Sequence, residues 1–162
     1  MKKIDLAYFA GFFDGEGSVT IHENGSPSPR GKVPNHTLQV SIGNTDPRVL
    51  EILHQQFGGS LTIRYVVKKN HRNVAQWTIR AAKTLPFLEA IFPYLRMKLD
   101  VVAVAIDFQK TKSMSGPKRV SEEDIKWRES RRRRIRELNA KPWILGARNE
   151  DQNPRVLLRP SV

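Results

Sequence analysis

Cysteine is absent from the 162 residues, which excludes a disulfide framework and a thiolate-bound metal site. Long apolar runs are absent as well, because the longest one near the N-terminus, residues 6–13, is far too short to cross a bilayer. No signal peptide is expected, since Asp5 interrupts the start and no small-residue cleavage site follows it. These absences predict an intracellular protein of the cytoplasm, the nucleoid or an organelle, with no membrane as a partner.

Acidic residues are few compared with basic ones: 16 Asp and Glu stand against 28 Lys and Arg, which gives a formal charge of +12. The chain is also 39% hydrophobic, enough for a packed core, so its charge does not indicate disorder. The expected partner is a polyanion. Nucleic acid is favoured over a membrane surface, because the basic residues alternate with strand-like polar positions rather than line one amphipathic helix.

Hydrophobic periodicity predicts an α+β order of helix, two strands, helix, two strands and further helices. The first helix is expected over residues 6–14, with Asp5 as its cap, and it ends in the run Gly15-Glu16-Gly17. A loop rich in proline, glycine and serine is expected at residues 25–34, between the first two strands. Further helices are expected between residues 45 and 59 and at residues 84–95, 98–112 and 121–138.

The four predicted strands alternate between apolar and polar residues. Their apolar side is expected to face the core and comprises Val19, Ile21, Leu38, Val40, Ile42, Leu61, Ile63, Tyr65, Ala75, Trp77 and Ile79. The opposite side carries almost no carboxylate, whereas an ordinary solvated sheet face would mix Glu with Lys. Two interpretations stay open: a solvated face that happens to be basic, and a nucleic-acid-binding face in which Arg and Lys contact phosphate or guanine and Gln and Asn contact adenine.

The candidate contacts to nucleic acid lie on this polar side and in the adjoining loops. Four of them are candidates for reading bases: Gln39, Arg64, Gln76 and Arg80. The others are Ser18, Thr20, His22, Asn24, Arg30, Lys32, Thr37, Ser41, Thr62, Lys68, Lys69, Arg72 and Thr78.

The first helix combines small residues with an acid at its end. Ala7 and Gly11 are four residues apart, with Ala10 beside them, and small residues at that spacing let two helix backbones approach closely. Glu16 falls at the C-terminal end of the helix, where the helix dipole disfavours an anion. If a two-fold axis relates two such helices, two Glu16 carboxylates face each other, and a cation between them removes the repulsion. Mg²⁺ suits such oxygen ligands, and the chemistry it supports is phosphodiester hydrolysis.

Three segments together resemble the LAGLIDADG homing endonuclease family. They are residues 9–17 (FAGFFDGEG) with the following strand, residues 40–46 (VSIGNTD) and residues 92–98 (FPYLRMK). The resemblance covers residues 5 to about 112. It implies an αββαββα core with a four-stranded antiparallel DNA-binding saddle, formed by residues 1–112. Residues 113–162 are then a basic, helical C-terminal extension of the same domain.

The resemblance also implies roles for individual residues. Glu16 matches the metal-binding acid, and Gly15 the neighbour whose carbonyl joins the metal shell. Lys98 resembles the active-site lysine that stabilises charge at the scissile phosphate. Asn44 is close to the polar residue that positions water, although a plain helix cap explains it nearly as well, and Arg48 resembles the basic residue just after it. The implied cofactor is Mg²⁺, and Ca²⁺ is expected to bind without supporting cleavage.

The sequence contains only one such motif. One-motif relatives pair as homodimers, so the resemblance implies a C2 dimer whose interface includes Ala7, Ala10 and Gly11. It implies a DNA endonuclease encoded within an intron, acting on double-stranded DNA at a long and partly palindromic target. The alternative is a non-cutting nucleic-acid-binding module, either an intron-RNA maturase or a DNA-binding regulator. Residues 131–134 are four arginines that cover every face of a helix, and both a solvated and a phosphate-contacting helix fit them.

Overall fold

The computed structural model describes residues 1–26, 33–64, 73–114 and 120–140 of the chain. Its helices and strands confirm the predicted α+β order. In chain order they are α1 (Lys3–Glu16), β1 (Gly17–Ser26), β2 (Val33–Asn44), α2 (Arg48–Phe57), β3 (Ser60–Arg64), β4 (Val74–Arg80), the 3-10 helix η1 (Ala81–Lys83), α3 (Thr84–Ile91), the 3-10 helix η2 (Phe92–Tyr94), α4 (Leu99–Met114) and α5 (Glu122–Ala140).

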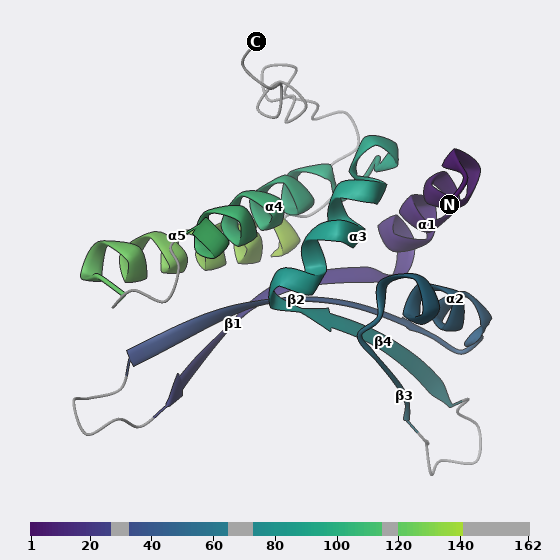
Figure 1. The fold of residues 1–162 in the computed structure, drawn as a ribbon, viewed down its shortest axis with the longest axis horizontal. Helices are drawn as coiled ribbons and strands as arrows, with labels where there is room; N and C mark the ends of the chain where they lie inside the picture. The colour runs from purple at the N-terminus through teal and green to yellow at the C-terminus, as the bar shows by residue number, and fades with distance from the viewer. Residues whose placement is uncertain (27–32, 65–72, 115–119, 141–162) are drawn as a thin grey trace.

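The four strands form one antiparallel sheet in the order β1-β2-β4-β3. All the described helices lie on one side of this sheet, and no described helix or strand covers its other side, called the open side below (Figure 1). The two hairpins curve away from the helices at opposite ends of the sheet, so the open side is concave, as the predicted saddle requires (Figure 1). The β1–β2 pairing continues to Ser26 and Val33, which makes the strands longer than predicted at both edges of the expected 25–34 loop.

The core lies between the sheet and the helices, and an aromatic cluster is at its centre. The ring of Phe87 in α3 meets Phe13, Phe57 and Trp77 edge to face, at centroid distances of 5.5, 5.1 and 5.0 Å. The indole N–H of Trp77 is satisfied by the carbonyl of Gly58, at 2.8 Å. Trp77 is fully buried, as the period-two alternation of β4 predicts.

The prediction of which strand residues face the core is confirmed at most positions and wrong at one. In β1, β2 and β4 every predicted inward residue is buried. Ile63 in β3 is 51% exposed instead. β3 is an edge strand, and its far end reaches past the helices that cover the middle of the sheet (Figure 1). Tyr65, predicted inward on the same strand, lies outside the described residues.

Two of the predicted helices need correction. α1 begins at Lys3 rather than Leu6, and Asp5 lies in its first turn, where its carboxylate accepts the backbone N–H of Lys2 at 3.0 Å. The predicted 84–95 helix divides into α3 and η2 at Pro93, because proline has no N–H for the helical ladder.

The C-terminal helix packs on the core. Ser121 and Asp124 cap it reciprocally through backbone N–H bonds of 3.1 and 3.2 Å. Trp127 stacks on Phe108 of α4 at 5.8 Å, and Asn139 donates to the backbone carbonyl of Val19 in β1 at 3.1 Å. α4 continues past residue 112 to Met114, and the division of the chain at residue 112 stays a prediction. Among the described helices, none is both long and apolar enough to cross a membrane.

Candidate functional site

The C-terminal end of α1 is held to the start of α4 by Asp14. This carboxylate is only 5% exposed, and it accepts backbone N–H bonds from Arg96 at 2.7 Å and from Lys98 at 2.9 Å. The ammonium of Lys98 in turn donates to the backbone carbonyl of Asp14. The structure therefore brings Lys98 to the same helix end as Glu16, although the two are 82 positions apart in the sequence.

Electrostatics at this helix end involve three charges. Burial lowers the pKa of the Lys98 ammonium below its usual value, and the attraction of Asp14 and Glu16 offsets part of that effect. Glu16 itself is exposed, the last residue of α1. An exposed carboxylate beside a partly desolvated ammonium can bind a hard cation and a phosphate oxygen at the same place.

The backbone carbonyls of the last turn of α1 form part of the same site. The final carbonyls of a helix have no intrahelical donors. The Phe13 carbonyl accepts the N–H of Gly17, and the Asp14 carbonyl accepts the Lys98 ammonium, which leaves the Gly15 carbonyl next to Glu16. Only glycine fits at position 17, because a Cβ there would lie 2.2 Å from the ring of Phe13. The chain therefore turns from the acid directly into β1.

Asn44 and Arg48 lie at the turn from β2 into α2. The side-chain oxygen of Asn44 accepts the backbone N–H of Asp46 at 2.9 Å, so Asn44 stabilises the turn. The Asp46 carboxylate binds the guanidinium of Arg48 at 2.5–3.1 Å, and these bonds lower the pKa of Asp46 to about 2. Within the described part of the chain, no hydrogen bond or ion pair joins Asn44 or Arg48 to Glu16 or Lys98.

The open side of the sheet carries the predicted polar residues in cross-strand rows. One row runs Ser18–Ser41–Thr78–Ser60, and the next runs Thr20–Gln39–Arg80. Arg80 donates from Nε to the side-chain oxygen of Gln39 at 2.7 Å. His22, Asn24, Thr37, Thr62 and Gln76 also lie on this side.

Ser41 was predicted as a contact to nucleic acid, and its surroundings argue against this. Ser41 lies on the open side of the sheet, as predicted, but it is only 9% exposed. Its hydroxyl lies 2.9 Å from that of Ser18 on the neighbouring strand, so the two hydroxyls satisfy each other. A base or phosphate would reach Ser18 first.

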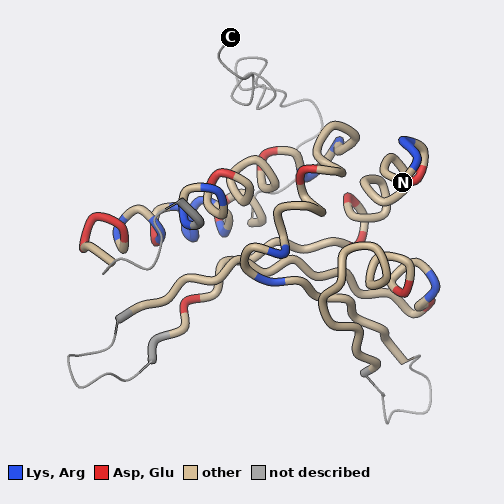
Figure 2. Tube along the Cα trace, in the orientation of Figure 1, with Lys and Arg blue, Asp and Glu red and all other residues tan. Residues whose placement is uncertain are grey.

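The described strands contain one carboxylate, that of Glu23 (Figure 2). It continues the inward side of Val19 and Ile21, so it points to the helices and binds Arg132 of α5 at 2.9 Å. The open side is therefore free of acids among the described residues, which favours the nucleic-acid interpretation of that side over the solvated one.

The positions of six predicted DNA contacts stay untested. Arg30, Lys32, Lys68, Lys69 and Arg72 lie outside the described residues, and of Arg64 only the backbone is described.

The exposed side of α1 is apolar. Ile4 is 75% exposed and Tyr8 57%, and Ala7 and Gly11 are exposed on the same side of the helix. A Cβ at Gly11 would meet no atom within 4 Å. Ala10 is fully buried against the core of its own chain, so its predicted place in an interface is wrong. Its position on the helix is 100° away from Gly11, on the side shared with Phe9 and Phe13.

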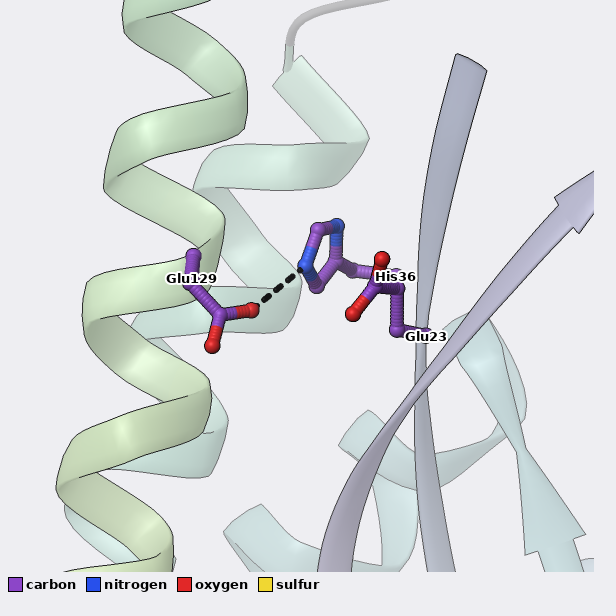
Figure 3. Close-up of side chains that lie close together, drawn as sticks. All are labelled: Glu23, His36 and Glu129. Atoms are coloured by element: carbon purple, nitrogen blue, oxygen red, sulfur yellow. Dashed lines mark hydrogen bonds and ion pairs between the residues drawn. The ribbon is translucent and has the colours of Figure 1, made fainter. Parts of the chain in front are cut away.

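A second charged cluster, not predicted from the sequence, joins α5 to the β1–β2 hairpin. Glu23, His36 and Glu129 bring one ligand atom each to within 4.8 Å of one another, and His36 Nε2 lies 3.2 Å from Glu129 (Figure 3). Arg132 already donates to both carboxylates at 2.9–3.0 Å, so its guanidinium takes the place of a cation. Glu23 and His36 lie opposite each other in the hairpin, but Glu129 is 93 positions from His36, so the sequence spacing carries no signal of the cluster.

Comparison with known proteins gives one family and a consistent fold. The profile of the family described as LAGLIDADG endonuclease matches residues 9–114, well over half of the chain. No curated protein sequence matches. A crystal structure of the homing endonuclease I-CvuI, in complex with its target in the presence of 2 mM Ca, is similar with a TM-score of 0.66 and 16% identity, over 86% of this chain and 85% of that one.

Two further structures share the fold. The archaeal intron-encoded homing endonuclease I-Vdi141I, complexed with DNA, has a TM-score of 0.65 and 14% identity over 98% of this chain and 94% of its own. The homing endonuclease I-TnaI has a TM-score of 0.59 and 18% identity over 86% and 96%.

Proposed function

Because the chain belongs to the LAGLIDADG endonuclease family, we propose that it makes a double-strand break in DNA at a specific, long and partly palindromic target. The observation that carries the proposal is the joint position of Glu16 and Lys98 at the end of α1, where β1 begins. β1 begins at this helix end and forms part of the open side of the sheet. A duplex bound to the open side would therefore bring a phosphate to Glu16 and Lys98.

We propose that Mg²⁺ is held by the Glu16 carboxylate and the Gly15 carbonyl. The donors fit the ion, because both are hard oxygens and the Phe13 and Asp14 carbonyls of that turn already have donors. When bound, the ion lowers the pKa of a water that it binds and stabilises the negative charge on the leaving oxygen. The similar I-CvuI complex is described with Ca, and Ca²⁺ is expected to support binding here without cleavage.

The protein's own side chains complete the proposed site. The Lys98 ammonium attracts the scissile phosphate and stabilises the charge that develops on it. Asn44 has its side-chain oxygen engaged by the backbone of Asp46, so its amide N–H groups are the part that can orient a water. Arg48 is proposed as the basic residue next to Asn44 in the site, and its Nε and Nη2 are already bound to Asp46.

DNA contacts are proposed for the open side of the sheet. Polar side chains there face outward from all four strands, without a carboxylate to repel phosphate among the described residues. The candidates whose side chains are described are Ser18, Thr20, His22, Asn24, Thr37, Gln39, Thr62, Gln76, Thr78 and Arg80.

The active form is proposed to be a homodimer in which α1 of one copy packs on α1 of the other. The exposed residues Ile4, Ala7, Tyr8 and Gly11 supply an apolar contact with a shallow, small-residue centre. A two-fold axis there would bring both Glu16 residues near the axis, one for each DNA strand. The coding sequence is proposed to lie within an intron, and the similar archaeal endonuclease I-Vdi141I is intron-encoded.

The proposal is tested by incubating the protein with a randomised library of duplex DNA and Mg²⁺ and sequencing the ends produced. We expect recurrent ends within one partly palindromic sequence. The Lys98→Met variant is the control and should yield almost none of these ends. Recurrent binding without cleavage by the wild-type protein, or binding to RNA alone, would favour the non-cutting module instead.

A further inference from the structure

The second polar row of the open side contains an arginine with an unusual partner. Thr20, Gln39 and Arg80 are directly opposite one another on β1, β2 and β4. Arg80 is exposed, and its Nε donates to the side-chain oxygen of Gln39 at 2.7 Å. The acceptor must be the amide oxygen, since an N–H cannot donate to an NH₂ group, so this bond also fixes which way the Gln39 amide points.

The neutral partner separates Arg80 from other arginines of the chain. Arg48, Arg131, Arg132 and Arg134 each pair with a carboxylate, at 2.5–3.5 Å. A carboxylate would orient the guanidinium but would also cancel its charge. An amide oxygen orients the guanidinium and leaves the full positive charge available for a ligand.

The geometry of the bond determines which donors remain. With Nε occupied by Gln39, the plane of the guanidinium is fixed and the two terminal nitrogens, Nη1 and Nη2, remain at its outer edge. Two parallel N–H donors match the O6 and N7 acceptors of guanine in the major groove. Gln39, by contrast, has its acceptor engaged, and a bidentate contact to adenine requires both an acceptor and a donor.

We propose that Arg80 reads a guanine and that Gln39 is its positioning residue rather than a reader of bases; the inference rests on the proposed function. Along β1 the row lies three residues past Gly17, and Arg80 lies two strands away from β1, on β4. A guanine is therefore expected in each half of the target, away from the cleavage site itself.

The test is selection of a randomised duplex library by the full-length protein in the presence of Ca²⁺, followed by sequencing of the bound fraction. The wild-type protein should select a two-fold related guanine in each half-site. Arg80→Ala should reduce the preference for that guanine by about 5- to 150-fold. Gln39→Ala should reduce it about 10-fold and leave the other positions as they are.

Two further variants separate positioning from a merely structural role. Gln39→Glu keeps an acceptor for Arg80 Nε, so it should retain the guanine preference. Its added negative charge should weaken binding to all sequences alike and reduce the slope of log K against log salt. Gln76→Ala removes a glutamine from the same side that is not bonded to Arg80, and it should leave the guanine position unaffected.

The outcomes distinguish the inference from the proposed function. A wild-type protein that selects no sequence contradicts the proposed function. A wild-type protein that selects a target in which Arg80→Ala changes no position overturns the inference alone. Loss of preference at every position in Gln39→Ala, together with loss of thermal stability, would also overturn it, because Gln39 would then be structural.

Discussion

The buried carboxylate of Asp14 accepts the backbone N–H of Lys98, and the Lys98 ammonium donates to the backbone carbonyl of Asp14. This reciprocal contact connects the helix that presents Glu16 to the helix that begins after Lys98. It also explains why two acids close together in the motif have different surroundings: Asp14 is buried and fully bonded, and Glu16 is exposed.

We expect Asp14→Ala to lower the free energy of unfolding by about 3 kcal/mol, because it removes a buried, charged acceptor of two N–H bonds and leaves both donors unsatisfied. Chemical denaturation measures this loss. Asp100→Ala is the matched control in the exposed first turn of α4 and should cost less than about 1 kcal/mol. Equal losses in the two variants would show that the Asp14 contacts are not structural.

Two glycines of the motif should respond oppositely to alanine. At position 17 a Cβ would overlap the buried ring and the carbonyl of Phe13, so Gly17→Ala should cost about 1–3 kcal/mol. At position 15 it would meet no atom within 4 Å, and Gly15→Ala should stabilise the helix by up to about 1 kcal/mol. Melting temperatures of both variants check the contrast, and a stable Gly17→Ala protein would contradict this account of the helix exit.

The cluster around Glu129 should make stability depend on pH. Burial raises the pKa of Glu129, but hydrogen bonds and charges from Arg132 and His36 lower it by more, so its net pKa is below the usual 4.5. A lowered carboxyl pKa stabilises the fold above the unfolded-state value, and this stabilisation is lost as the pH falls through the folded-state value. The gap in unfolding free energy between wild type and Glu129→Gln should therefore be constant above about pH 5 and shrink in more acidic solution.

Arg132→Met tests the cause of that pH dependence. Without the guanidinium, the pKa of Glu129 should rise, and the acid-dependent loss of stability attributable to Glu129 should be smaller than in the wild type. An unchanged acid profile in Arg132→Met would mean that the ion pair does not stabilise the packing of α5 on the hairpin.

The dimer can be tested without disturbing the fold of one chain. Gly11→Leu places its side chain in open space on an exposed helix, where leucine favours the helix by about 1 kcal/mol over glycine. We expect an unchanged or raised melting temperature together with a monomer in light scattering. Gln55→Leu, on the exposed side of α2, is the control and should leave the assembly unchanged. A dimeric Gly11→Leu protein would contradict the proposed α1 interface.

Local patterns predicted much of the fold and part of the site. Alternation in β1, β2 and β4 indicated the correct inward side because each strand is covered by helices along that side. The same pattern was wrong at Ile63, since alternation predicts a side but not whether a helix covers it. Small-residue spacing did not separate Ala10 from Gly11, because the core accepts a small residue as readily as an interface does.

Contacts between distant elements had no local signal. The His36–Glu129 pair and the Gln39–Arg80 bond each join residues far apart in the chain. Their residue types predict only that these positions are polar. The strand register and the packing of α5 determine which residues become partners. Glu16 could be identified because the helix, its small residues and the acid are contiguous in the sequence.

The most direct measurement of the central claim compares cleavage and binding in Glu16→Gln, on the duplex selected by the wild-type protein. The exposed carboxylate is proposed to bind Mg²⁺, so its amide replacement should abolish cleavage. Binding in a gel shift should be retained or tightened, because a negative charge near phosphate is removed from each copy. Cleavage by Glu16→Gln at the wild-type rate, or loss of binding in parallel with loss of cleavage, would contradict the assignment.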